Sequence, residues 1–321
     1  MNIILNILYI VLGSAGLYYG AEFLVKGGVA LARKAGVSPL VIGLTLVAFA
    51  TSAPELVVSV SAALSGNVDI SLGNVMGSNI CNIALILGLS ACIRPLPVQK
   101  QLLKFDAPVM IGATLLLTAF YFLNQGVNRW QGALFFLLLL AYVAYNVYMA
   151  KKEGSSEIPE EVAEAEKGGK LLPVWAALLL VIAGLALLVG GADLFLRGAK
   201  FIAKLFKLSD AVIGLTIVAV GTSLPELATS LVAAAKGETD IAIGNVIGSN
   251  IFNILCILGI APMICPMTGT RLDLADLGAM LFCAIILLPM MRIKWKITRP
   301  EGAFLVLFYI GYISYLLMKT V

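Results

Sequence analysis

Two glutamates lie deep inside long apolar segments of this 321-residue chain, where carboxylates are rare. Glu55 occurs in the run ATSAPEL and Glu226 in the run GTSLPEL, with no lysine or arginine beside either. Because a carboxylate in such a helix costs free energy to bury, it marks a cation site or a proton relay by default. We therefore interpret these two side chains as the centre of a functional site.

Each glutamate follows two hydroxyl residues by three and four positions, which places all three side chains on one helical face. The hydroxyl residues are Thr51, Ser52, Thr222 and Ser223. Pro54 and Pro225 directly precede the glutamates, and a proline lacks the N–H that would bond to the carbonyl four residues back. This frees the carbonyls of Ala50 and Gly221, and such broken helices are tolerated where they meet a cavity or an ion. The alternative interpretation is a packing kink with back-bonded hydroxyls.

A second pair of motifs adds amides and further hydroxyls. The runs GNVMGSNICN and GNVIGSNIFN repeat asparagine, serine and asparagine at intervals of four, which forms one polar stripe along a helix. The stripe residues are Asn74, Ser78, Asn82, Asn245, Ser249 and Asn253. We expect Asn79 and Asn250 to hydrogen-bond between helices. The combined oxygen set suits Ca²⁺ or Na⁺, whereas the absence of histidine and of paired cysteines from the sequence disfavours zinc or copper.

The motifs recur because the chain contains an internal duplication. Residues 41–90 and 212–261 align at a constant offset of 171, and about 30 of the 50 pairs are identical. Between the copies lies a polar stretch rich in Glu, Gly and Ser, which is typical of a linker. The resulting division is a first repeat at 1–150, a linker at 151–170 and a second repeat at 171–321.

The composition indicates a membrane protein. Hydrophobic residues make up 60% of the chain and charged residues only 12%, about half the charged fraction of a soluble domain. Ten apolar segments, five in each repeat, approach or exceed the roughly 20 residues that cross a bilayer. They lie near 3–32, 39–65, 70–93, 104–123 and 130–150, and near 172–203, 210–236, 241–264, 274–291 and 301–319. Because lipid offers no partner to backbone groups, we expect all ten to be α-helices.

An odd number of segments per repeat predicts an inverted duplication. A five-span unit begins on one side of the membrane and ends on the other, so its copy inserts upside down, as in many secondary transporters. The expected fold is an all-α polytopic membrane protein with ten transmembrane helices in two inverted five-helix repeats. With the N-terminus outside, 15 of the 22 basic residues lie in inside loops. This bias favours a cytoplasmic linker and both termini outside an inner or plasma membrane.

The paired ATSAPEL/GTSLPEL and GNVMGSNICN/GNVIGSNIFN motifs resemble the two α-repeats of the Ca²⁺/cation antiporter superfamily, and most closely those of prokaryotic sodium/calcium exchangers. The resemblance covers essentially the whole chain. It implies adjacent cation sites among four broken helices, and a helix pair, 3–32 and 172–203, that slides across a rigid remainder. The ligands it implies are Glu55, Glu226, the hydroxyls of Thr51, Ser52, Thr222 and Ser223, the carbonyls of Ala48 and Ala219, and Ser78, Asn82, Ser249 and Asn253. The two alanine carbonyls come from the resemblance alone.

The sequence therefore predicts a secondary active antiporter, not an enzyme, that exports Ca²⁺ against entering Na⁺ by alternating access. Some exchangers of the family carry an aspartate where this chain has Asn82 or Asn253, so this site holds two formal negative charges and its driving ion stays open. The alternatives are a H⁺- or K⁺-coupled exchanger and, in a different class, a cation channel. The expected partners are Ca²⁺, Na⁺ and the lipid bilayer, without a cofactor, a nucleic acid or an obligate protein partner.

Overall fold

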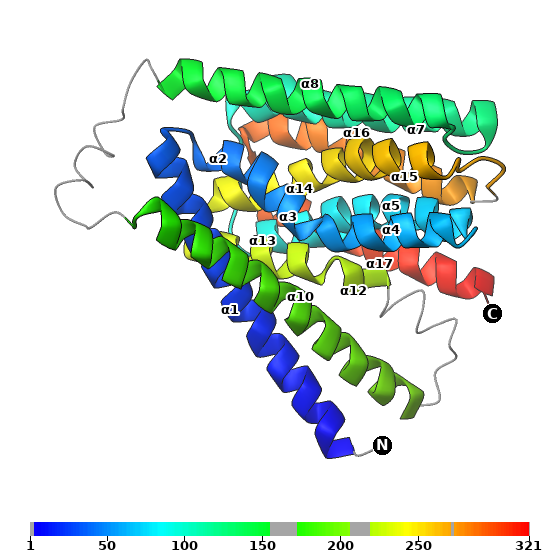
Figure 1. Ribbon diagram of the computed structural model, residues 1–321, viewed down its shortest axis with the longest axis horizontal. Coiled ribbons are helices and arrows are strands. Elements are labelled where there is room, and N and C mark those ends of the chain that lie inside the picture. The colour runs from blue at the N-terminus through cyan, green and yellow to red at the C-terminus, as the bar shows by residue number, and fades with distance from the viewer. Residues whose placement is uncertain (1–2, 155–171, 206–218, 271–272, 321) are drawn as a thin grey trace.

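The computed structural model describes residues 3–154, 172–205, 219–270 and 273–320. Most of its helices run in stacked layers (Figure 1). Eight helical segments of this described part are long and apolar enough to cross a membrane. They are Ile3–Ala35, Val68–Ile93, Leu102–Asn124, Arg129–Ala150, Val174–Ile202, Thr239–Ile264, Leu274–Lys294 and Arg299–Met318. The chain is therefore a multi-pass helical membrane protein.

A further candidate span is a helix pair that is broken in the middle. Pro39–Thr51 and Ala53–Leu64 meet at an angle of 43°, and the residue between them, Ser52, has φ −84° and ψ 2°. Pro54 lies in the first turn of the following helix, where a missing N–H costs no helix bond. The predicted break is confirmed here. The parts of this segment are α2 (Pro39–Ile42), the π-helical η1 (Gly43–Val47), α3 (Ala48–Thr51) and α4 (Ala53–Leu64).

The second repeat breaks at the corresponding residue. Ser223, with φ −91° and ψ 12°, separates α12 (Ala219–Thr222) from α13 (Leu224–Lys236). Pro225 again lies in the first turn of the helix that follows. The predicted segment 210–236 begins outside the described residues, so α12 and α13 are its described part.

The remaining helices follow the predicted segments closely, with shifts of a few residues at their ends. Their bounds are α1 (Ile3–Ala35), α5 (Val68–Ile80), η2 (Cys81–Leu87), α6 (Gly88–Ile93), η3 (Leu102–Asp106), α7 (Ala107–Asn124), α8 (Arg129–Gly154), α10 (Val174–Leu205), α14 (Thr239–Phe252), η5 (Asn253–Ile257), α15 (Leu258–Ile264), α16 (Leu274–Lys294) and α17 (Arg299–Thr320). Helix α8 continues four residues into the predicted linker, and the rest of that linker lies outside the described residues.

Wide π-helical turns interrupt both spans that carry the polar stripes. In the first repeat η2 follows α5, and Asn82 is its second residue. In the second repeat η5 follows α14, and Asn253 is its first residue. Such turns are rare and occur mostly at functional sites, because they change which side chains share one face of a helix. The last asparagine of each stripe is therefore presented by an irregular turn, which the sequence did not reveal.

Short backbone pairings join the two repeats. Strand β1 (Leu96–Pro97) pairs antiparallel with β2 (Lys296–Ile297), and an isolated bridge joins Val127 to Met267. Met267 is the equivalent of Leu96 at the offset of 171. The loop after the third segment of each repeat therefore pairs with the loop before the fifth segment of the other repeat, so the same contact is made twice with the repeats exchanged.

Helices α1 and α10 pack against each other and cross the other layers obliquely (Figure 1). Glycines allow the two backbones to approach closely. A Cβ placed on Gly191 would lie 2.8 Å from the backbone N of Leu17 and 2.9 Å from the carbonyl O of Gly13. Small residues at a helix crossing are typical of tight pairs in membranes, where close van der Waals packing replaces the hydrophobic effect. The two long helices therefore form one closely packed pair.

We expect Gly191→Ala to destabilise this pair, because the new methyl group would meet backbone atoms that cannot rotate away. Overpacking of this kind costs about 1–3 kcal/mol. The matched control is Gly190→Ala, since a Cβ on Gly190 meets no atom within 4 Å. Thermal melting of the detergent-purified protein should show a lower melting temperature for Gly191→Ala and no decrease for the control. Equal melting temperatures would contradict the close approach.

Candidate cation-binding site

The two buried glutamates are linked across the interface between the repeats. Glu55 in α4 and Glu226 in α13 are each only 1% exposed. Ser52 Oγ donates a hydrogen bond of 3.0 Å to Glu226 Oε1, and Ser223 Oγ donates one of 3.3 Å to Glu55 Oε1. Each glutamate is therefore held by the serine that precedes the other glutamate, and the two helix breaks face each other.

The helix breaks also supply positive electrostatic potential to the glutamates. Glu55 lies in the first turn of α4, and Glu226 lies in the first turn of α13. The first turn of a helix carries backbone N–H groups without helical partners and a partial positive charge, both of which favour a carboxylate. A break in each span thus creates a helix N-terminus at the residue that bears the negative charge.

The residues just before the first break also turn toward the second repeat. Thr51 Oγ1 lies 3.1 Å from Asn245 Oδ1 and 3.4 Å from the carbonyl O of Ala48. The same carbonyl accepts the N–H of Ser52 at 3.0 Å. In the second repeat, Ala219 and Thr222 are the first and last residues of α12. Both alanines implied by the family resemblance therefore lie four residues before a break, in the turn that ends there.

The first asparagine of each polar stripe holds the broken helix in place. Asn245 Nδ2 donates to Ser230 Oγ at 2.9 Å, and it lies 3.5 Å from the carbonyl O of Glu226. In the first repeat Asn74 Nδ2 donates to Ser59 Oγ at 3.0 Å. The two serines are equivalent at the offset of 171, so the same bond is made in both repeats. These asparagines position the glutamate-bearing helices.

The later stripe residues bring buried oxygen atoms to the same interface. Ser78 Oγ lies 3.4 Å from Ser223 Oγ. The turn η2 packs against α13, and η5 packs against α4, so Asn82 and Asn253 each lie beside the broken helix of the opposite repeat. Within the described residues, the buried oxygens of the predicted ligands that have no hydrogen-bond partner are Glu55 Oε2, Glu226 Oε2, Asn82 Oδ1, Ser249 Oγ and Asn253 Oδ1.

The chemistry of these atoms fits a hard cation. A buried polar atom without a partner costs about 1–3 kcal/mol, and more if it is charged. Several such oxygen atoms together therefore favour the binding of a cation that oxygen atoms coordinate. In the described part of the chain, no lysine or arginine pairs with either glutamate. Nor do three or more Cys, Asp or Glu side chains gather there as they would in a transition-metal centre. Two carboxylates and several neutral oxygens therefore define the site.

Two asparagines outside the stripes differ in their roles. Asn79 Oδ1 accepts a hydrogen bond of 3.3 Å from Asn253 Nδ2, so the prediction that Asn79 bonds between helices is confirmed. The same prediction for Asn250 is wrong, because its Nδ2 donates to the carbonyl O of Val246 in its own helix at 2.8 Å. This bond to Asn79 fixes the amide of Asn253 and leaves the Oδ1 of Asn253 for another partner.

The sequence interpretation missed a third buried carboxylate. Asp106 is fully buried within the span Leu102–Asn124, and Tyr142 Oη donates a hydrogen bond of 3.0 Å to its Oδ1. Its position near the end of an apolar segment, close to a lysine, made it look like a boundary residue. The signal that could have found it is the duplication: Tyr312 Oη donates to Asp276 Oδ1 at 2.7 Å, at an offset of 170 for both residues. These pairs join η3 to α8 and α16 to α17.

Buried carboxylates between facing helix breaks in a multi-pass membrane protein describe a secondary transporter of cations. The profile of the sodium/calcium exchanger protein family matches residues 5–148 and 176–318. The chain belongs to this family, which is one of transporters rather than enzymes, and it is accordingly a membrane antiporter of Ca²⁺ and other cations.

Individual relatives match over almost the whole chain. CaxA of Alkalimonas amylolytica is 39% identical over 324 residues, which cover 98% of each chain. The sodium/calcium exchanger MaX1 of Methanosarcina acetivorans is 35% identical over 97% of this chain and 98% of its own. A solved structure of the sodium-calcium exchanger NCX_Mj matches with a TM-score of 0.84 and 34% identity, over 98% of this chain and all of that one.

We expect Ser52→Ala and Ser223→Ala each to weaken Ca²⁺ binding by about tenfold or more. Each change removes the hydroxyl that contacts the opposite glutamate, and hydrogen bonds to charged groups are worth about 1.5–3 kcal/mol. The matched control is Ser65→Ala, because this exposed hydroxyl bonds to the carbonyl of Ser61 in its own helix. Isothermal titration of the purified protein with Ca²⁺ measures the effect. Wild-type affinity in both buried variants would show that the serines do not support the site.

Proposed function

We propose that this chain exports Ca²⁺ from the cell in exchange for entering Na⁺, by alternating access to the site between Glu55 and Glu226. The observation that carries the proposal is the reciprocal pair of hydrogen bonds from Ser52 to Glu226 and from Ser223 to Glu55. It brings two carboxylates into one buried site without a basic partner among the described residues. Two like charges in a medium of low dielectric are costly unless a cation or protons neutralise them. The empty site should therefore not switch its access freely from one side of the membrane to the other.

The proposal includes ten transmembrane helices in two inverted repeats of five, with α12 and α13 as the described part of the seventh. Contacts that recur with the repeats exchanged support it. They include the loop pairings Leu96–Ile297 and Val127–Met267 and the two serine–glutamate bonds. In this architecture both termini lie outside the cell, and the linker 151–170 lies in the cytoplasm.

We assign the cation shell to residues of both repeats. Ca²⁺ takes about six to eight oxygen ligands, and two carboxylates balance its charge. The proposed ligands are Glu55, Glu226, the hydroxyls of Thr51, Ser52, Thr222, Ser223, Ser78 and Ser249, the carbonyls of Ala48 and Ala219, and the amide oxygens of Asn82 and Asn253. Na⁺ would use the same oxygens, and occupancy by one ion excludes the other. This competition couples the two fluxes.

A H⁺- or K⁺-coupled exchanger is the second candidate. The observation that favours it is the asparagine at both position 82 and position 253, which leaves only two negative charges in the proposed shell. Protons on Glu55 and Glu226 would neutralise such a site as completely as Na⁺ would. Measurements of ⁴⁵Ca²⁺ flux into proteoliposomes, with Na⁺, K⁺ and pH gradients imposed one at a time, separate these candidates. Flux that ignores all three gradients would indicate a channel and overturn the exchange mechanism.

We expect Glu55→Gln and Glu226→Gln each to reduce Ca²⁺ transport more than a hundredfold. Each change removes one of the two carboxylate charges that neutralise a bound divalent cation. The attraction between one carboxylate and the cation is on the order of several kcal/mol at ligand distance. The matched control is Glu238→Gln, since Glu238 lies at the start of α14, at the end of a span. Sodium-driven ⁴⁵Ca²⁺ flux measures activity, and size-exclusion chromatography checks the fold. Near-wild-type flux in both glutamate variants would contradict the assignment.

A further inference from the structure

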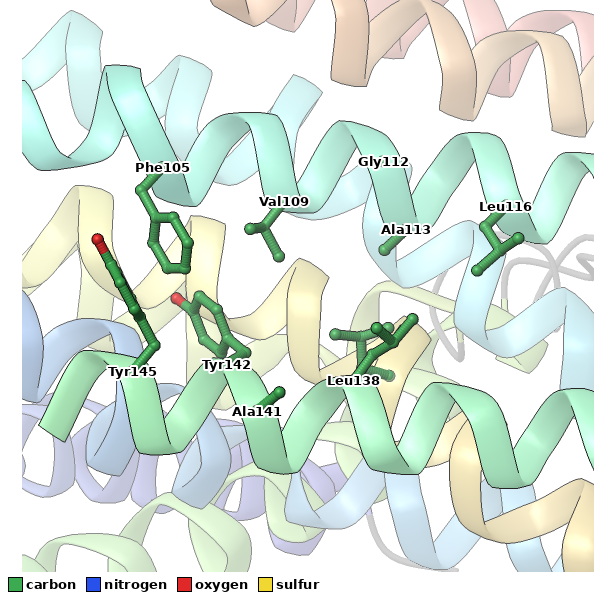
Figure 2. A pocket seen from close by; sticks show the side chains of 10 residues that line it. Phe105, Val109, Gly112, Ala113, Leu116, Leu138, Ala141, Tyr142 and Tyr145 are labelled. Carbon is green, nitrogen blue, oxygen red and sulfur yellow. The ribbon is translucent and has the colours of Figure 1, made fainter. Parts of the chain in front are cut away.

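An apolar groove runs between α7 and α8 on the side of the molecule away from α1 and α10. Its volume is about 460 Å³, and side chains of the two helices point into it from both sides (Figure 2). Its lining includes Phe105, Val109 and Leu116 from the η3–α7 span, and Leu138 and Tyr145 from α8. Both helices are candidate membrane spans, and Leu138 and Tyr145 are each 39% exposed. The groove therefore opens at membrane depth.

The groove exists because small residues stand where larger ones would fill it. Gly112 lies in its wall, and a Cβ built on Gly112 would meet no atom within 4 Å. Ala113 and Ala141 also line it (Figure 2). Protein interiors are close-packed, so a space of this size beside a helix pair is normally filled by a side chain or by another molecule.

The second repeat fills the corresponding space with its own side chains. The pairs Asp106–Tyr142 and Asp276–Tyr312 fix the offset between these helices at 170. At this offset Gly112 and Leu138 correspond to Phe282 and Phe308. The rings of these two phenylalanines pack with their centroids 4.6 Å apart. The same helix pair is therefore closed by two aromatic rings in one repeat and left open in the other.

Aromatic rings line one end of the groove, and a lysine directly precedes one of them in the sequence. The rings of Phe105 and Tyr145 pack there with centroids 3.9 Å apart. Lys104, directly before Phe105, is exposed, whereas its equivalent at the offset of 170 is the exposed apolar residue Leu274. Tyrosine and lysine at the end of a span are typical of the level of the lipid headgroups. The open groove and the positive charge thus occur together, in one repeat.

We propose that this groove binds one anionic phospholipid, with an acyl chain between α7 and α8 and the phosphate beside Lys104. The lining from Phe105 to Leu116 covers twelve residues, a rise of about 16 Å along the helix, which suits much of one acyl chain. The groove reaches Leu255 in η5, two residues from the candidate ligand Asn253. The bound chain therefore packs against the irregular turn that presents Asn253.

The test is photocrosslinking of the full-length chain with phosphatidylglycerol that carries a diazirine in one acyl chain, followed by mass spectrometry of the labelled peptides. Wild-type protein should be labelled within 105–116 and 138–145. In the variant Gly112→Phe/Leu138→Phe, which copies the second repeat, this labelling should fall about tenfold. A decrease of that size is expected when roughly two methylene groups of the lipid lose their contacts. The matched control is Gly278→Phe in α16, an exposed glycine that also has no atom within 4 Å of its Cβ.

Charge is tested with Lys104→Leu, which copies the second repeat at the polar end. Labelling by the phosphatidylglycerol probe should fall, while labelling by a phosphatidylcholine probe with the same acyl chain should not. Ala141→Leu provides a second way to fill the groove, and circular dichroism checks the fold of each variant. Undiminished labelling in folded variants whose groove is filled would overturn the proposal. So would equal labelling by the two probes in both the wild type and Lys104→Leu. A dimer that dissociates on filling the groove would also overturn it, by assigning the groove to a second copy of the chain.

Discussion

The cost of burying two carboxylates together is the constraint on which the rest of this structure depends. Each glutamate needs hydrogen-bond donors and positive potential that no basic side chain of the described residues supplies. A helix break meets both needs, because it places the carboxylate in the first turn of a new helix and releases the serine before it. The prolines allow the break at little cost, since each lies where its missing N–H is not needed. The breaks are therefore the means by which an all-helical protein solvates a charge inside the membrane.

The second feature follows from the first. Each released serine, Ser52 or Ser223, bonds to the glutamate of the opposite repeat, so neither repeat can complete its half of the site alone. The π-helical turns also join the two repeats, because η2 packs against α13 and η5 packs against α4. A site built in this way lies on the interface between the repeats.

The sequence predicted the parts of this arrangement that depend on local chemistry. The apolar runs and the proline breaks could be predicted because hydropathy and a missing N–H are properties of short segments. The duplication could be predicted because the two copies align directly in the sequence. The π-helical turns at Asn82 and Asn253 were not readable, since they depend on packing against the other repeat. Asp106 was missed because it lies near the end of an apolar segment, and its bond to Tyr142 on the next helix depends on tertiary packing. The predicted bond of Asn250 to another helix was wrong for a related reason. An asparagine amide can bond to a carbonyl of its own helix as readily as across an interface.

Strict exchange of the two repeats would make the two end states of the proposed transport cycle equal in energy, and one ion pair argues that they are not. Glu22 Oε1 on α1 lies 2.7 Å from both Lys26 Nζ and Lys236 Nζ, so it ties α1 to the end of α13. Its equivalent on α10, Asp193, pairs with Arg197, but the residue equivalent to Lys236 is the uncharged Ser65. Exchanging the roles of the repeats therefore breaks one contact and forms no counterpart. Because both partners are partly exposed, such a pair is worth about 0–1 kcal/mol. A difference of that size shifts two populations by at most about fivefold, which biases a transport cycle toward one state without preventing it from reaching the other.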